Sequence, residues 1–146
     1  MYKNDEIRII NLPKIEDDRG NLSFIEEEIH IPFKIKRSYW VYDVPGGETR
    51  GSHAFKNSKE FIIALSGSFD IVLHDGTEEK KFSLNRSYYG LYIPKMIWRN
   101  IENFSTNSLA LILSSVPYNE ADYIRDFNQF LTLLKKCKNQ LYITVL

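Results

Sequence analysis

The chain has 146 residues, of which 43% are hydrophobic and 26% are charged. This length suits one domain with one hydrophobic core, and the composition excludes a disordered chain. Lys and Arg together number 19, as do Asp and Glu, so the formal net charge is zero and no long-range field attracts nucleic acid or an anionic membrane.

The cysteine content and the lengths of the apolar runs bear on the compartment. The single Cys137 excludes an internal disulfide and a thiolate zinc site. No apolar run approaches the roughly 20 residues that span a bilayer. Met1 is not followed by the basic and apolar regions of a signal peptide. We therefore expect a cytoplasmic protein that acts on neither nucleic acid nor membrane.

Short strands separated by turns dominate most of the chain. The segment 36–43 is rich in β-forming residues and stops at the turn 45–47. The continuous apolar run 61–65 suits a strand buried on both faces, and 68–73 alternates before a hairpin signal at 74–77. Many short strands at this spacing predict a sandwich or a barrel. The expected strands are 21–27, 36–43, 61–65, 68–73, 81–84, 88–93 and 109–114.

The C-terminal part of the chain predicts a helix over about 119–138. Asn119 suits its N-cap, and aromatic and aliphatic residues then recur at three- and four-residue intervals on one face. The tail 139–146 ends in an apolar segment, 141–146, that is typical of a strand. An exposed apolar strand is a sticky edge, so we expect this segment to be paired, for example in a dimer.

A set of spaced residues near the middle of the chain carries the first functional signal. The pattern G-x5-H-x-F-x4-E-x6-G is formed by Gly47, His53, Phe55, Glu60 and Gly67. It resembles the first motif of the cupin superfamily, G-x5-H-x-H-x3,4-E-x6-G. The resemblance implies an all-β cupin fold in one domain over 1–146, with a double-stranded β-helix, or jelly roll, over about 7–116 and the helix after it. Strand residues alternate between faces, so Phe55 should share the inner face with His53.

Two of the four positions that hold metal ligands in cupins carry other residues here. The second histidine of the motif is Phe55, and the histidine expected five residues after Pro94 is Arg99. A guanidinium has no lone pair to give a metal, and His53 with Glu60 alone makes a poor site. We therefore predict no functional metal and no cofactor.

A narrower resemblance rests on short stretches that match in order and spacing from about residue 15 to 130. They are DRGNL (18–22), IPF (31–33), IKR (35–37) with Tyr39, RGSHA (50–54), LSGS (65–68), GLYI (90–93) with Trp98, and Tyr118 with DYIR (122–125). The chain is similar in them to the nucleotide-sugar 3,4-ketoisomerases of the cupin superfamily. The resemblance implies action on dTDP-4-keto-6-deoxyglucose, which supplies 3-amino sugars for surface polysaccharides such as lipopolysaccharide. It also implies a metal-free homodimer with exchanged strands.

The chain departs from that family at three polar positions. The family signature R-G-x-H-A-H reads RGSHAF here, and the common Glu-Gln pair is Lys59-Glu60. The family pair Trp-His is Trp98-Arg99. These departures concern the mechanism more than the fold, and they leave open a different stereochemical outcome or a lost activity.

A 3,4-ketoisomerase needs a base for the C3 proton, an acid for C4 and donors that stabilise the enediolate. By resemblance and by chemistry, His53 suits the base, because a histidine ordinarily titrates near neutral pH. The resemblance makes Tyr39 an active-site proton donor and Arg19 a contact to phosphate or substrate. The alternatives are core packing for His53 and Tyr39 and a surface turn for Arg19.

The other candidate residues bind substrate. Arg37 and Arg50 are candidates for the pyrophosphate of the dTDP group. Trp98 either stacks on a ring of the substrate or fills the mouth of the barrel. Arg99 replaces an imidazole as a hydrogen-bond donor but not as a base, and Glu60 is a second base or an ion-pair partner.

The leading functional prediction is a dTDP-sugar 3,4-ketoisomerase, an intramolecular isomerase. One alternative is a cupin that binds the nucleotide sugar without catalysis, because Phe55 stands where the family has a histidine. Another is an epimerase of the same class of substrate. The C4 configuration of the product depends on which face of the sugar receives the proton, and the sequence does not decide it.

Overall fold

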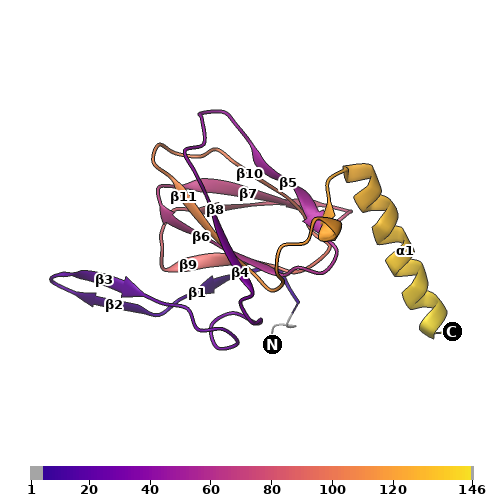
Figure 1. Ribbon diagram of the computed structural model, residues 1–146, viewed down its shortest axis with the longest axis horizontal. Helices are drawn as coiled ribbons and strands as arrows, with labels where there is room; N and C mark the ends of the chain where they lie inside the picture. The colour runs from indigo at the N-terminus through magenta and orange to yellow at the C-terminus, as the bar shows by residue number, and fades with distance from the viewer. Residues whose placement is uncertain (1–4, 146) are drawn as a thin grey trace.

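Figure 1 shows the protein as a computed structural model, which describes residues 5–145. Strands are the main secondary structure of this part of the chain. Two helices lie near its C-terminal end, with β12 between them. The strands are β1 (Arg8–Asn11), β2 (Lys14–Asp17), β3 (Gly20–Ser23), β4 (Arg37–Tyr42), β5 (Arg50–Phe55), β6 (Glu60–Ser66), β7 (Phe69–His74), β8 (Glu79–Leu84), β9 (Tyr89–Ile93), β10 (Trp98–Glu102), β11 (Leu109–Ser114) and β12 (Tyr123–Ile124). The helices are the 3-10 helix η1 (Glu120–Asp122) and the α-helix α1 (Phe127–Val145).

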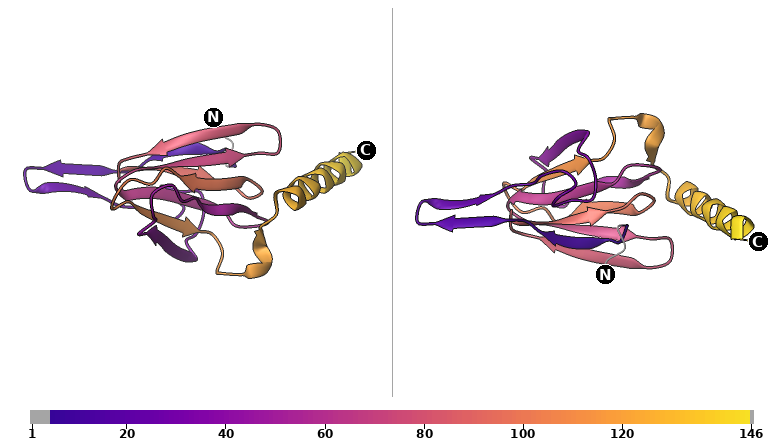
Figure 2. Two further views of the ribbon diagram at one scale, coloured as in Figure 1. Left: turned by 90° about the horizontal axis from the view of Figure 1, so that it is seen from above. Right: turned by 90° about the horizontal axis from the view of Figure 1, so that it is seen from below.

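Two five-stranded sheets form the body of the molecule (Figure 2). The first has the strand order β1-β9-β6-β11-β4, and the second has the order β12-β5-β10-β7-β8. The strand pairs in both sheets are antiparallel, and most neighbours come from distant parts of the sequence. This is a jelly roll, so the cupin fold predicted from the sequence is confirmed.

Apolar side chains from both sheets fill the space between them. The main core consists of Ile62, Ala64, Phe69, Ile71, Leu73, Leu84, Leu91, Ile93, Ile101, Ala110 and Ile112. A second cluster covers the outer face of the first sheet, where Phe61 and Ile63 of β6 meet Ile31 and Phe33. Because β6 is covered on both faces, its sequence is a continuous apolar run rather than an alternating one. Burial of each large side chain stabilises the fold by about 1.5–3 kcal/mol.

Two segments project from opposite ends of the sandwich (Figures 1 and 2). At one end, β2 and β3 form an antiparallel hairpin whose residues are exposed. Ile15 and Leu22 in this hairpin are 56% and 55% exposed. Helix α1 lies at the other end. No helix among the described residues is long and apolar enough to cross a membrane.

Most strands lie where the sequence predicts them. The expected strands 36–43, 61–65, 68–73, 81–84, 88–93 and 109–114 correspond to β4, β6, β7, β8, β9 and β11. The strand predicted over 21–27 is wrong in its second half, because β3 ends at Ser23. Four strands were not expected, namely β1, β2, β10 and β12, and β5 was expected only from the cupin motif. β10 has the sequence WRNIE, whose buried Arg99 breaks the apolar alternation that marks a strand.

The predicted helix over 119–138 begins too early. Asn119 does cap a helix, but that helix is η1. The Asn119 side-chain oxygen accepts a hydrogen bond from the Ala121 N–H. Tyr123 and Ile124 then pair with β5, and the fully buried Ile124 gains more from this sheet than from continuing a helix. Helix α1 begins at Phe127, after the Asp126 side chain accepts the Gln129 N–H at 2.8 Å.

The predicted strand over 141–146 is also wrong. Helix α1 runs through 141 to Val145, and only Leu146 of the segment lies outside the described residues. Adding a residue to an existing helix costs no new nucleation, and neither Pro nor Gly interrupts α1. Local β propensity is therefore overridden by the helix that precedes the segment.

Candidate active site

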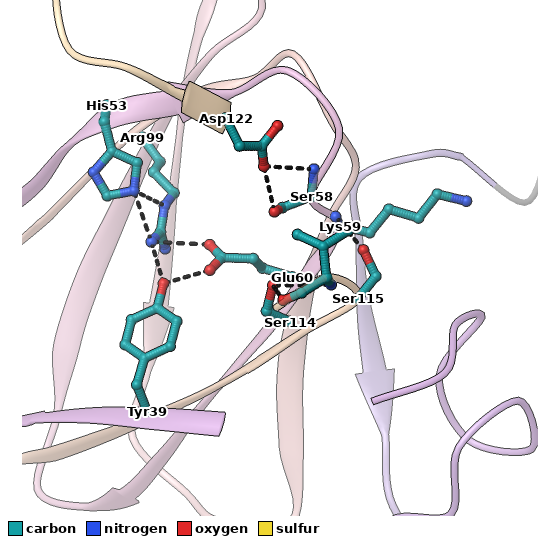
Figure 3. Close-up of polar contacts among 10 residues, drawn as sticks. Tyr39, His53, Ser58, Lys59, Glu60, Arg99, Ser114, Ser115 and Asp122 are labelled. Atoms are coloured by element: carbon teal, nitrogen blue, oxygen red, sulfur yellow. Dashed lines mark hydrogen bonds and ion pairs between the residues drawn. The ribbon is translucent and has the colours of Figure 1, made fainter. Parts of the chain in front are cut away.

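Four polar side chains from both sheets converge inside the sandwich (Figure 3). Tyr39 and Glu60 come from β4 and β6 of the first sheet, and His53 and Arg99 come from β5 and β10 of the second. Alternation along each strand turns these side chains inward; in β4, for example, Tyr39 is half-buried whereas Trp40 is exposed. We call Tyr39, His53, Glu60 and Arg99 the polar cluster.

Arg99 lies at the centre of the polar cluster. Its Nη2 lies 2.9 Å from Oε1 of Glu60, and both side chains are 2% exposed. The same Nη2 donates to the Tyr39 hydroxyl at 2.8 Å. Nε donates to Nε2 of His53 at 3.3 Å, and Nη2 lies 3.1 Å from that imidazole nitrogen. Because a guanidinium only donates, the Nε contact directs the Nε2 lone pair toward Arg99 and assigns the imidazole proton to Nδ1.

Tyr39 links the two charged members of the polar cluster. Its hydroxyl accepts from Arg99 and donates a short hydrogen bond to Oε2 of Glu60. Burial raises the pKa of Tyr39, and the Glu60 carboxylate raises it further against the opposing charge of Arg99. Tyr39 therefore keeps its proton at neutral pH and acts as a donor.

His53 is held in its neutral form. Burial, followed by the positive charges of Arg99 and Arg125, lowers the pKa of His53 to about 3. A neutral imidazole has a lone pair that can accept a proton. His53 can therefore act as a base at neutral pH.

The ion pair between Glu60 and Arg99 is buried. Burial raises the pKa of Glu60 although Arg99 and the Tyr39 hydrogen bond act in the opposite direction. Burial also opposes the charge of Arg99, but Glu60 and Tyr39 raise its pKa, so the guanidinium stays protonated. A buried pair of this kind loses stability if one partner is removed, because the other charge remains in the interior.

Phe55 occupies the inner face beside His53, as the alternation of the strand predicts. The ring centroids of His53 and Phe55 lie 4.8 Å apart, and Tyr123 of β12 lies 5.0 Å from His53. The Arg99 guanidinium carbon lies 5.5 Å from the centre of the Phe55 ring. Phe55 therefore supplies packing and a cation–π contact, but it has no proton to transfer.

Comparison with known proteins places this geometry in a family. The chain matches the family described as "FdtA: WxcM-like, C-terminal" over residues 5–135. The protein belongs to the FdtA family. It is 38% identical over 131 residues to a TDP-4-oxo-6-deoxy-alpha-D-glucose-3,4-oxoisomerase from Aneurinibacillus thermoaerophilus, which covers 90% of this chain and 94% of the relative.

Solved structures resemble this FdtA-family protein over nearly their whole length. A 3,4-ketoisomerase from Helicobacter canadensis is 41% identical, with a TM-score of 0.87 over 90% of this chain and 98% of that one. A variant of the QdtA 3,4-ketoisomerase from Thermoanaerobacterium thermosaccharolyticum, in complex with TDP-4-keto-6-deoxyglucose, is 38% identical with a TM-score of 0.87. That match covers 93% of this chain and 97% of the other.

A charged and aromatic rim lies beside the polar cluster of this FdtA-family protein. The Arg37 guanidinium carbon lies 4.9 Å from the Tyr39 ring and 5.5 Å from the Tyr118 ring. Arg125 lies 4.4 Å from the Tyr123 ring and pairs with Glu120 at 2.8 Å. Arg37 was predicted from the sequence, whereas Arg125 and Glu120 were not assigned a role. Their signal was the matching stretch at 118–125.

Three predicted site residues lie away from the polar cluster in this chain. The Arg19 side chain is 90% exposed on the turn between β2 and β3 and pairs with Asp17 at 3.0 Å. Arg50 is exposed at the start of β5 and has no polar contact with the cluster. Trp98 faces α1 rather than the interior, with its ring 5.3 Å from Phe127, because it alternates with the inward Arg99.

Asp122 is a buried residue whose role the sequence did not indicate. It was expected in the first turn of a helix, but its carboxylate accepts hydrogen bonds from the loop between β5 and β6. The Ser58 hydroxyl donates at 2.6 Å and its N–H at 3.2 Å, and the Asn57 N–H donates at 2.8 Å. Asp122 thereby holds the loop between β5, which carries His53, and β6, which carries Glu60, against η1 (Figure 3).

The metal prediction concerns the same inner face. Among residues 5–145, no three His, Cys, Asp or Glu side chains gather closely enough to hold a metal ion together. At the position where the cupin motif has a histidine ligand, the Arg99 guanidinium pairs with Glu60 and donates to His53. The donor set of this inner face therefore does not fit a divalent cation. Metal content itself stays a prediction.

Proposed function

We propose that the protein is a sugar 3,4-ketoisomerase that converts dTDP-4-keto-6-deoxyglucose into dTDP-3-keto-6-deoxyhexose. The observation that carries this proposal is the neutral, buried imidazole of His53, set beside the donors of Arg99 and Tyr39. The named activity of the Aneurinibacillus relative and the ligand of the QdtA variant support the choice of substrate.

The reaction moves a carbonyl group by one carbon and needs no net oxidation. The base removes the C3 proton, and the C3–H electron pair forms the C3–C4 double bond while the C4 carbonyl becomes an enediolate oxygen. The C3 hydroxyl then gives up its proton as the C3 carbonyl forms. C4 receives one proton on carbon, and the C4 oxygen receives the other and becomes a hydroxyl. Atoms and electrons balance within the sugar, so positioned acids, bases and donors suffice.

The polar cluster assigns these tasks to separate groups. His53 accepts the C3 proton on Nε2, and the Arg99 donors move from Nε2 to the developing enediolate oxygen. Buried Nη1 of Arg99 has no hydrogen-bond partner among the described residues and offers a further donor. Tyr39 and Glu60, joined by a hydrogen bond, carry protons between the two oxygens.

The rim holds the nucleotide. Arg37 beside Tyr39 and Arg125 beside Tyr123 offer guanidinium groups that can bind the two phosphates of dTDP. Tyr118 and Tyr123 provide aromatic faces between them. Arg50 and Trp98 stay predictions from the sequence as substrate contacts.

We further propose a homodimer with exchanged strands, because Arg19 lies away from the polar cluster of its own chain. The projecting hairpin of β2 and β3 carries Arg19 on its turn and exposes Ile15 and Leu22, which a second subunit would cover. Arg19 then contacts substrate in the partner. Light scattering at micromolar concentration should give twice the 17.2 kDa monomer mass, and a monomer mass would contradict the proposal.

Phe55 favours one rival function, a cupin that binds the nucleotide sugar without turnover. Incubation with dTDP-4-keto-6-deoxyglucose in D2O, followed by NMR of the sugar protons, separates the candidates. A new 3-keto sugar that carries deuterium identifies the isomerase. Binding without exchange identifies the rival, and an inverted centre with an unmoved ketone identifies an epimerase.

The cytoplasmic location stays a prediction, which cell fractionation would check.

A further inference from the structure

A groove lies between α1 and the end of the sandwich, outside the polar cluster. Its volume is about 550 Å3. The helix contributes Leu133, Leu134, Cys137, Gln140 and Leu141, and the sandwich contributes Lys56, Lys95 and Met96. We call this the α1 groove. None of these residues belongs to the site proposed for the sugar nucleotide.

The α1 groove is formed by one continuous face of the helix. On a helical wheel, Phe130, Leu134, Cys137 and Leu141 point in similar directions, since they are spaced by three and four residues. Phe130 at the start of this stripe is fully buried against the sandwich, whereas Leu141 is 67% exposed. The same face that packs at the start of the helix is therefore open farther along.

The outer part of the α1 groove also lies beyond the region that the family match covers. That match ends at residue 135, and α1 continues to Val145. Cys137 and Leu141 thus belong to a continuation of the helix that the match to the isomerase family does not include. The proposed isomerase activity leaves this continuation without a role.

The charged side chains that line the α1 groove, Lys56 and Lys95, have one sign. Helix α1 contains Lys135, Lys136 and Lys138 and no acidic residue. Lys56 and Lys95 are exposed on the opposite wall, and neither forms an ion pair with a described residue. The whole chain is neutral, so this is a local excess of positive charge beside an apolar surface.

We infer that the α1 groove docks an acidic amphipathic segment of another protein. Apolar side chains of that segment would contact Met96 and the leucine stripe, and its carboxylates would face Lys56 and Lys95. A second copy of α1 does not fit, because it would bring lysines against lysines. A lipid surface does not fit either, because the apolar stripe faces a concave groove and a bilayer is flat.

The test uses the full-length protein and three fluorescein-labelled peptides of 18 residues in fluorescence anisotropy. The first peptide has leucines on one helical face and glutamates on the other. The second has the same composition in an order that abolishes the apolar face, and the third has lysine in place of glutamate. The first should bind with a Kd in the micromolar range, and the other two at least tenfold more weakly.

Variants locate the binding. Lys56→Glu with Lys95→Glu should weaken binding of the acidic peptide at least tenfold, while the control Lys34→Glu with Lys80→Glu, on exposed lysines outside the α1 groove, should not. A benzophenone attached to Cys137, the single cysteine of the chain, should crosslink to the acidic peptide and not to the reordered one.

Three results would overturn the inference. They are equal binding of the acidic and reordered peptides, binding unchanged by Lys56→Glu with Lys95→Glu, and flotation of the protein with vesicles of phosphatidylcholine and phosphatidylglycerol that this double variant abolishes. The last result would assign the α1 groove to lipid. Circular dichroism and dTDP binding verify that each variant is folded.

Discussion

Arg99 and His53 face each other across the paired strands β10 and β5, and Nη2 of Arg99 lies 3.1 Å from Nε2 of His53. This contact joins the permanently charged Arg99 to the imidazole of His53. The imidazole must stay neutral to accept the hydrogen bond that Arg99 donates. The contact explains why a residue that cannot act as a base stands where cupins place a histidine ligand. Burial keeps the proposed base neutral, and Arg99 reinforces that state and orients the imidazole.

The pH dependence of turnover follows from the burial of His53 and from this contact. The pKa of His53 is lowered to about 3 from its ordinary 6.5, so the imidazole is the neutral base at every pH well above 3. We expect kcat/KM to change less than about threefold between pH 8 and pH 5 on account of His53. An acid limb centred near pH 6.5 would contradict this. Proton NMR of the imidazole signals separates His53 from the other two histidines.

Replacement of the base tests its role directly. His53→Asn should fold and bind dTDP, because Asn retains hydrogen bonding, but it should lose about 10²–10⁴-fold in kcat, because it cannot accept a proton at neutral pH. Calorimetric titration with dTDP and NMR assays of turnover measure the two effects. The matched control is His30→Asn, outside the polar cluster. Equal turnover in His53→Asn would move the base role elsewhere, with Glu60 the first candidate.

The tyrosine hydroxyl is the next test. Tyr39→Phe removes the group that accepts from Arg99 and donates to Glu60, and Phe55 offers no imidazole to replace it. We expect turnover to fall about 10²–10⁴-fold. The companion variant Phe55→His should be tolerated and should bind no metal, since Arg99 still opposes a cation. Near-normal turnover of Tyr39→Phe would exclude the proposed proton route.

The outcome of Phe55→His has a second use. If the wild type were inactive and Phe55→His were active on the 4-keto sugar nucleotide, the chain would be a member of the family that has lost catalysis through this one substitution. Comparable turnover of both proteins is the result that the polar cluster predicts.

The buried Asp122 predicts a stability effect. Asp122→Ala leaves the Ser58 hydroxyl and two backbone N–H groups without their acceptor, so the free energy of unfolding should fall by roughly 3 kcal/mol. Asp122→Asn keeps one acceptor oxygen and should lose less. Urea denaturation measures both. Equal stability of Asp122→Ala and wild type would show that Asp122 does not hold the loop.

Metal independence is the last prediction. Protein purified without added metal should contain far less than one equivalent of any divalent ion by elemental analysis, and EDTA should leave turnover unchanged. The physical reason is the Arg99 guanidinium, which pairs with Glu60 at 2.9 Å on the face where a cupin binds its metal. Loss of activity in EDTA that one divalent ion restores would show this prediction to be wrong.

The strand patterns in the sequence predicted a sandwich or a barrel, since strands such as β6 and β7 show an apolar run or an alternation with period two. The jelly roll itself was predicted from the resemblance to the cupin motif. The sequence also identified His53, Tyr39, Glu60 and Arg99 as site residues, because they stand at positions that the cupin motif or the family resemblance marks. It could not show that these four meet, since they come from four strands in two sheets.

Only the tertiary structure decided what surrounds those residues. The start of α1 was misplaced because the gain from pairing Ile124 with β5 and from burying Asp122 comes from residues more than sixty positions away. Trp98 and Arg99 are neighbours in sequence but face opposite sides of β10, and only the packed α1 shows which side is outside. Long-range contacts set these outcomes, and a sequence pattern reports only the local preferences that such contacts override.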